Sequence, residues 1–207
     1  MGGHAHGEIA SLTAVQLLQT HYDELLQSAA VSTEAIQEVI LKINDEFCQI
    51  ASSSRELYTM GTTLCGIIVK DYFIYGINIG DSRLYLFNEG VLKQISIDHT
   101  EGKRLLNLGF LTEEEVQNFP NRKAIYKHIG QRVNLKPDVF CLNNIISSSI
   151  LLICTDGLTD ALNDEEISNI LQSEKADLKQ CGKRLIEEGI TRNIGFDDNI
   201  TLMLIEF

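Results

Sequence analysis

The chain has 207 residues, with 44% hydrophobic and 22% charged residues and a formal net charge of −12. This length suffices for one domain with a sizeable core. The acidity disfavours nucleic acid and membranes as partners, because nucleic acids and anionic membranes bind basic patches. It attracts divalent cations, although it equally suits solubility alone.

The five cysteines are an odd number and form no C-x-x-C pair, which fits a reducing compartment. No apolar run approaches the roughly 18 residues of a membrane helix, and the start of the chain does not resemble a signal peptide. We therefore expect a cytoplasmic location.

Two amphipathic helices are predicted first. Apolar residues recur every three or four positions from Glu8 to about Gln27 and again from Thr33 to about Ala51. Ser32 or Thr33 can cap the second helix, with Glu34 favourable in its first turn.

The period then changes to that of β-strands. Runs at 62–69 and 72–79 flank Lys70-Asp71, and runs at 83–87 and 91–96 flank Asn88-Glu89-Gly90; both linkers are typical of hairpins. Links this short leave no room for crossover helices, so the sheet is predicted to be antiparallel.

The second half mixes both periods. A helical insertion is expected at about 100–118, with a capping box between Thr112 and Glu115. Strands are expected at 124–128, 138–142, 149–154 and 199–206. Helices are expected at 164–172, capped by Asn163, and at 176–188, with Gly189 as C-terminal cap.

The predicted fold class is α/β (α+β): two stacked antiparallel sheets flanked by helix pairs, in a four-layer α-β-β-α sandwich. The chain shows no repeat, linker or low-complexity tract and only two prolines. We therefore expect a single domain over residues 1–207.

Acidic steps beside predicted strand ends are the main functional signal. They are Gly80-Asp81-Ser82-Arg83, Cys154-Thr155-Asp156-Gly157-Leu158-Thr159-Asp160 and Gly195-Phe196-Asp197-Asp198-Asn199-Ile200-Thr201. Carboxylates at strand ends suit Mg²⁺ and Mn²⁺, which prefer oxygen ligands. Water held between two such ions can attack phosphorus. An acid placed after a buried strand is also costly unless it is paired or metal-bound. The pattern favours a metal-dependent phosphatase.

In this order the motifs resemble the metal-dependent protein serine/threonine phosphatases, the protein phosphatase 2C family, in its bacterial branch. The resemblance runs through nearly the whole chain. It rests on Met1-Gly2-Gly3-His4, Gly7-Glu8-Ile9-Ala10-Ser11, Met60-Gly61-Thr62-Thr63, Gly80-Asp81-Ser82-Arg83, Asp98-His99-Thr100, residues 109–114 with Pro120-Asn121-Arg122, Asp156-Gly157 and Asp198-Asn199.

The resemblance implies Mg²⁺ or Mn²⁺ as cofactor, with two core ions and a third, weaker one. Asp156 and Asp198 would bind the core ions. Gly157 and Asn199 would support them, and Asn199 would orient the Asp198 loop. Asp81 and Asp160 would hold the third ion.

His4 lies where some relatives place a histidine near the phosphate. It would then transfer a proton, or it is a loose histidine at a frayed terminus.

Local alternatives remain open for other residues. Asp81 also fits a turn, and Asp160 could cap the following helix. Arg83 and Arg122 could meet phosphate, although surface or ion-pair roles are favoured. His99 is expected in a local hydrogen-bond network under the Asp98 turn.

The chain departs from the family pattern at its N-terminal end. The family's two opening strands, with their Arg and the Asp-Gly that bridges both metals, would precede Met1, and the 207 residues do not contain them. The domain is therefore expected to be N-terminally truncated, with impaired chemistry. Uncovered sheet surface would favour a homodimer, or a rearranged N-terminus in which residues 1–7 cover the gap.

Three functional hypotheses follow. The first is hydrolysis of phosphoserine and phosphothreonine on proteins, with phosphorylated proteins as substrates and a cognate Ser/Thr kinase as the opposing partner. The second is a pseudophosphatase that binds phosphoproteins without hydrolysis. The third is a structural or assembly role for an acidic α/β domain.

Overall fold

The computed structural model describes residues 6–27, 31–142, 145–192 and 198–207. The chain divides into two compact units. Unit 1 comprises Met1–Asp81 and Asp98–Leu142, and unit 2 comprises Ser82–Ile97 and Asn143–Phe207. The expectation of a single domain stays a prediction.

Unit 1 begins with helices α1 (Gly7–Thr20), α2 (Tyr22–Gln27) and α3 (Thr33–Ala51). The predicted bounds of α3 are confirmed, and the Ser32 side chain caps it by accepting a hydrogen bond from the Ala35 amide. The prediction of one helix over 8–27 is wrong, because the chain leaves helical geometry at His21.

A cluster of charged side chains around the buried ring of His21 accompanies this break. The ring of His21 is buried, with Nδ1 3.0 Å from Glu24 Oε2 and Nε2 3.1 Å from Glu46 Oε1. Glu24 also accepts a hydrogen bond from Lys42 on α3. The hydrogen bonds to Glu46 and Glu24 raise the pKa of His21 above its ordinary value, against the opposing effects of burial and Lys42.

We expect the cluster to make stability depend on pH. A raised folded-state pKa means that the stabilisation is complete below about pH 6.5 and is lost as the pH rises through the folded value. The urea midpoint should therefore fall between pH 6 and pH 9, and fall less in His21→Asn. Equal pH dependence in both proteins would contradict this assignment.

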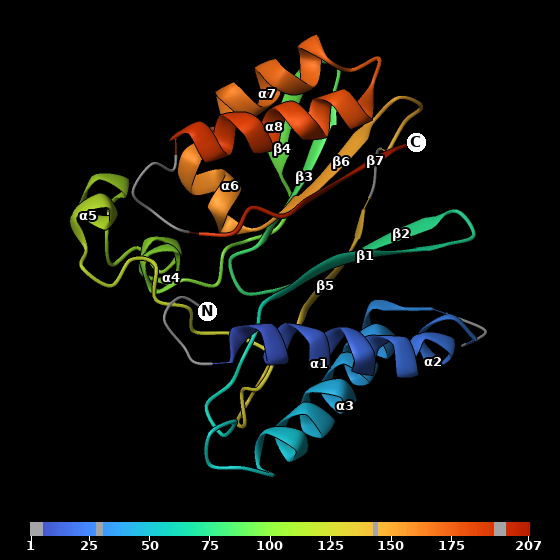
Figure 1. Ribbon diagram of the computed structural model, residues 1–207, viewed down its shortest axis with the longest axis vertical. Helices are drawn as coiled ribbons and strands as arrows, with labels where there is room; N and C mark the ends of the chain where they lie inside the picture. The colour runs from blue at the N-terminus through green and yellow to red at the C-terminus, as the bar shows by residue number, and fades with distance from the viewer. Residues whose placement is uncertain (1–5, 28–30, 143–144, 193–197) are drawn as a thin grey trace. The chain divides into compact units, whose positions relative to one another are not determined.

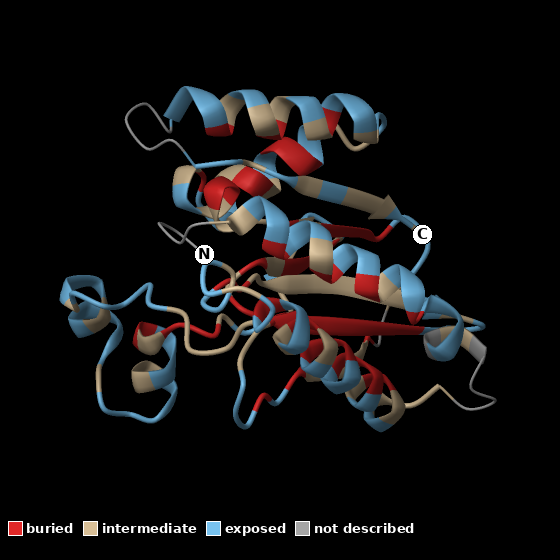
Figure 2. Ribbon diagram, turned by 60° about the horizontal axis from the view of Figure 1, so that its bottom comes forward, coloured by how far each residue is buried: buried red, intermediate tan, exposed pale blue. Residues whose placement is uncertain are grey.

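The sheet of unit 1 contains β1 (Leu64–Lys70), β2 (Phe73–Ile79) and β5 (Asp138–Leu142), in the order β1-β2-β5 and antiparallel throughout. Helices α1 and α3 cover one face of it (Figure 1). Figure 2 shows the buried residues concentrated on the strands and on the sides of the helices that face them. Their apolar core includes Ile40, Phe47, Tyr75, Ile77 and Ile79.

Two short helices, α4 (Glu101–Asn107) and α5 (Glu113–Asn118), form the predicted helical insertion. The capping box between Thr112 and Glu115 is confirmed. The strand predicted at 124–128 is wrong. Only isolated bridges occur there, between Thr62 and Ile129 and between Thr100 and Ile125.

The sheet of unit 2 has the order β4-β3-β6-β7, again antiparallel. Its strands are β3 (Arg83–Asn88), β4 (Val91–Gln94), β6 (Ile150–Cys154) and β7 (Leu202–Glu206), and its helices are α6 (Asp156–Ala161), α7 (Asp164–Ser173) and α8 (Leu178–Arg192). Helices α7 and α8 lie side by side over this sheet (Figure 1). The core between them includes Phe87, Leu152, Leu171 and Leu185.

Two expectations for the helices of unit 2 need correction. Gly189 does not cap α8 but lies inside it, where a Cβ atom would come within 2.7 Å of Ile200. The short helix α6 was not predicted. The capping of α7 by Asn163 is confirmed, with Glu166 completing a capping box.

Each unit thus contains one antiparallel sheet with helices on one face, as predicted; the stacking of the two sheets stays a prediction. Among the described residues, no helix combines the length and the apolar composition that a membrane span requires.

Candidate metal centre and active site

Asp156, the first residue of α6, and Asp198, in the segment before β7, lie at the same end of the unit 2 sheet. Strands β6 and β7 are antiparallel neighbours, and Cys154 at the end of β6 pairs with Leu202 at the start of β7. Asp156 follows β6 by two residues, and Asp198 precedes β7 by four. The strand register therefore brings the two predicted ligands to the same end of the sheet.

Hydrogen bonds tie the start of α6 to the segment before β7. The amide of Thr155 donates to the carbonyl of Thr201 over 3.0 Å, and the amide of Thr201 donates to Thr155 Oγ1 over 3.0 Å. In the segment before β7, the Asn199 amide donates to Asp198 Oδ1 over 2.9 Å. The main chain of Asn199 thus orients the Asp198 carboxylate, in keeping with its predicted supporting role.

Gly157 supports the same junction through its lack of a side chain. It is buried in the first turn of α6. A Cβ atom there would lie 2.5 Å from the carbonyl oxygen of Asn199, far inside van der Waals contact. Any larger residue would push the Asp198 loop away from Asp156.

The two carboxylates differ in exposure. Asp156 is half-buried, and Asp198 is exposed to solvent. The argument that an acid after a buried strand is costly unless it is paired or metal-bound therefore does not apply to Asp198, which is exposed and precedes its strand.

The donor atoms at this edge fit part of a site for a hard cation. Carboxylate oxygens are the ligands that Mg²⁺ and Mn²⁺ prefer, and these ions usually keep several waters. Among the residues that the structure describes, no three His, Cys, Asp or Glu side chains gather in a group that could hold a metal. Asp156 and Asp198 alone would therefore bind such an ion weakly.

The other predicted residues are placed as follows. Asp160 is exposed and lies one turn after Asp156 on α6. It does not cap α7, since Asn163 does. Asp81 is half-buried in unit 1, directly after Gly80. His4 lies outside the described residues.

His99 anchors the turn that carries Asp81. Its buried ring accepts a hydrogen bond from the Gly80 amide at Nδ1 over 3.0 Å, and its amide donates to the Gly80 carbonyl over 2.9 Å. Because Nδ1 accepts, Nε2 carries the proton and donates to Asp138 Oδ2 over 2.9 Å. The prediction of a local network for His99 is confirmed.

The sequence did not predict the contact of Asp138 with Lys127. Lys127 donates to Asp138 Oδ1 over 2.7 Å. Burial favours the protonated form of Asp138, but the hydrogen bonds from His99 and Lys127 outweigh it and lower the pKa of Asp138. No local pattern links His99 to Asp138, because 39 residues separate them.

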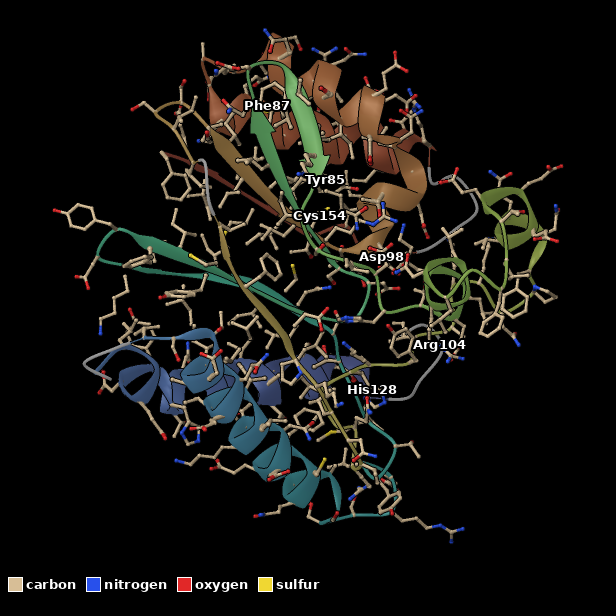
Figure 3. The ribbon with its side chains drawn as sticks, turned by 180° about the vertical axis from the view of Figure 1, so that it is seen from behind. Tyr85, Phe87, Asp98, Arg104, His128 and Cys154 are labelled. Carbon is tan, nitrogen blue, oxygen red and sulfur yellow. The ribbon has the colours of Figure 1, made fainter. Side chains whose placement is uncertain are left out.

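Arg83 takes part in a polar chain inside unit 2. It donates to the hydroxyl of Tyr85 over 3.0 Å, and that hydroxyl donates to Asp164 over 2.9 Å. Burial raises the pKa of Tyr85, which keeps its hydroxyl protonated. Tyr85 lies along β3, and Cys154 ends the neighbouring β6 (Figure 3). These contacts give Arg83 a structural hydrogen bond inside unit 2, and its binding of phosphate stays a prediction.

Comparison with known proteins decides the family. The family model described as protein phosphatase 2C matches residues 1–199. The chain belongs to the protein phosphatase 2C family. The resemblance inferred from the motifs is thereby confirmed, and with it the enzyme class, a metal-dependent protein phosphatase.

Bacterial relatives agree with this membership. The chain is 33% identical over 209 residues to the serine/threonine phosphatase stp of Listeria innocua, covering all of this chain and 81% of that protein. It is 30% identical over 205 residues to the serine/threonine protein phosphatase PstP of Mycobacterium tuberculosis, covering 99% of this chain and 38% of that protein.

Solved structures support the fold. The serine/threonine phosphatase Stp1 from Staphylococcus aureus superposes with a TM-score of 0.87 at 30% identity, covering 100% of this chain and 80% of that one. The catalytic domain of PstP, in complex with two manganese ions, superposes with a TM-score of 0.80 at 28% identity, covering 100% and 84%. The predicted mixed α/β class with two antiparallel sheets is confirmed.

Proposed function

We propose that this phosphatase hydrolyses phosphoserine and phosphothreonine on proteins with Mg²⁺ or Mn²⁺ bound by Asp156 and Asp198. The junction of the two segments that carry these residues, at one end of the unit 2 sheet, is the observation that carries the proposal. Relatives named serine/threonine phosphatases support hydrolysis over the binding-only alternative.

The roles of the chain's residues follow from the site. A bound Mg²⁺ or Mn²⁺ would acidify a coordinated water and polarise the phosphoryl oxygens. Asp156 and Asp198 would supply carboxylate oxygens, and Asn199 and Gly157 would keep the Asp198 loop in place. The binding of a third ion by Asp81 and Asp160 and the proton transfer by His4 stay predictions.

The expected impairment concerns metal affinity. Two carboxylates hold an ion less firmly than three, and the described residues bring no third His, Cys, Asp or Glu side chain to Asp156 and Asp198. We therefore expect these two residues alone to bind Mn²⁺ weakly, and the impairment of turnover stays a prediction.

Phosphorylated proteins are the proposed substrates. The opposing Ser/Thr kinase, the cytoplasmic location and the homodimer stay predictions. Exposed apolar side chains at the β1–β2 hairpin, Tyr72 and Phe73, and Met203 on β7 are consistent with association. Light scattering at micromolar concentration tests it, and a monomer at all concentrations would contradict the dimer.

Phosphate release from a phosphothreonine peptide tests the proposal. We expect slow release with Mn²⁺, none with EDTA, and recovery when Mn²⁺ is added back. A peptide with the same flanking residues and phosphotyrosine in place of phosphothreonine serves as the control for substrate class. Release that persists in EDTA, or none at millimolar Mn²⁺, would contradict the proposed function.

A further inference from the structure

The hydroxyl of Thr155 lies between the start of α6, which carries Asp156, and the segment that carries Asp198. It accepts a hydrogen bond from the Thr201 amide over 3.0 Å, and it lies 3.2 Å from the carbonyl oxygen of Asn199, to which it can donate. Thr155 directly precedes Asp156, and Asn199 directly follows Asp198. One side chain therefore joins the immediate neighbours of both carboxylates.

This use of the hydroxyl is unusual for its position. Thr155 is the N-cap residue of α6, where a threonine side chain normally accepts a hydrogen bond from the first turn of its own helix. Its side chain makes no such bond. Four other N-cap residues in the described structure do cap their helices: Ser32, Thr100, Thr112 and Asn163.

We propose that Thr155 is a positioning residue that sets the separation of Asp156 and Asp198. The inference rests on the proposed function, since it matters only if these carboxylates bind the metal. Asp198 is exposed, so packing does not fix it, and the hydrogen bonds of its loop must do so. Mg²⁺ requires ligand oxygens within a narrow range of distances, so a loosened loop should weaken binding.

Two substitutions separate the hydroxyl from the shape of the side chain. Thr155→Val keeps the branched shape and removes the hydroxyl, whereas Thr155→Ser keeps the hydroxyl. Calorimetric titration should show Mn²⁺ affinity about tenfold weaker in Thr155→Val and within about twofold of the parent in Thr155→Ser. If the valine variant does not fold, Thr155→Ala replaces it in the comparison with serine.

A second readout needs no metal. Amide hydrogen exchange at Thr201 should be faster in Thr155→Val than in Thr155→Ser, because the amide loses its acceptor. A merely structural role would lower the unfolding midpoint of the valine variant while leaving the Mn²⁺ affinity of its folded form unchanged. That result would overturn the inference.

Asp198→Asn, titrated in parallel, distinguishes this inference from the proposed function. If Asp198→Asn weakens Mn²⁺ binding and Thr155→Val does not, the positioning role is wrong and the metal site stands. If neither substitution changes the affinity, the metal site itself is wrong, and the positioning role falls with it. Weakening in both, with Thr155→Ser close to the parent, supports the proposal.

Discussion

Asp198→Asn is expected to reduce Mn²⁺-dependent turnover by about a hundredfold or more. The change keeps the size of the side chain and removes the negative charge from one of two proposed ligands. A hundredfold loss corresponds to roughly 3 kcal/mol of transition-state stabilisation, within the several kcal/mol that metal positioning supplies. The exposure of Asp198 means that folding should be unaffected.

The rate constant kcat/KM with p-nitrophenyl phosphate, measured over a range of Mn²⁺ concentrations, checks this expectation. Asp71→Asn is the matched control. Asp71 is exposed in the β1–β2 turn with φ of 53°, a conformation that Asn tolerates well. The control should keep its activity within about twofold. Parent-like activity in Asp198→Asn would rule out the proposed ligand.

His99→Ala is expected to destabilise the folded chain by about 3 kcal/mol. The substitution leaves the Gly80 amide without its acceptor, removes one partner of Asp138 and opens a cavity at a fully buried position. An unsatisfied buried donor costs about 1–3 kcal/mol, and the cavity adds to this.

Urea denaturation measures the effect, and His99→Asn is the matched comparison. The amide oxygen of Asn can accept the hydrogen bond from Gly80, although it cannot reach Asp138 in the same way. The loss in His99→Asn should therefore be smaller than in His99→Ala. Equal losses would show that the Gly80 hydrogen bond contributes little.

The sequence predicted best those elements that depend on near neighbours. The bounds of α3, the capping boxes at Thr112 and Asn163, and both hairpins depend on residues a few positions apart. In the β3–β4 turn, Glu89 and Gly90 both adopt positive φ, as a tight hairpin requires.

The errors arose where distant contacts prevail. The apolar run at 124–128 has strand composition but finds only isolated bridges. Glycine commonly follows the end of a helix, yet Gly189 lies inside α8, at a place where a Cβ atom would meet the distant residue Ile200. At His21, contact with Glu46, 25 residues away, accompanies the end of α1.

The site shows the same division. The position of acidic residues beside predicted strand ends suggested Asp156 and Asp198 as candidate ligands. The register of β6 and β7 explains why both lie at the same end of the sheet. The contacts of Thr155 with Asn199 and Thr201 span 44 and 46 residues, so no local pattern reveals them. Motifs at strand ends can therefore suggest candidate ligands, whereas the contacts around these candidates require the folded structure.

Nuclear magnetic resonance with Mn²⁺ tests the central claim most directly, because a bound paramagnetic ion broadens the signals of nearby amides. Substoichiometric Mn²⁺ should selectively broaden the amide signals of Gly157 and Asn199, which adjoin the proposed ligands. Broadening at both loops, and its loss in Asp198→Asn, is the predicted result. Broadening that is uniform over the acidic surface, or that spares both loops, would contradict a metal site formed by Asp156 and Asp198.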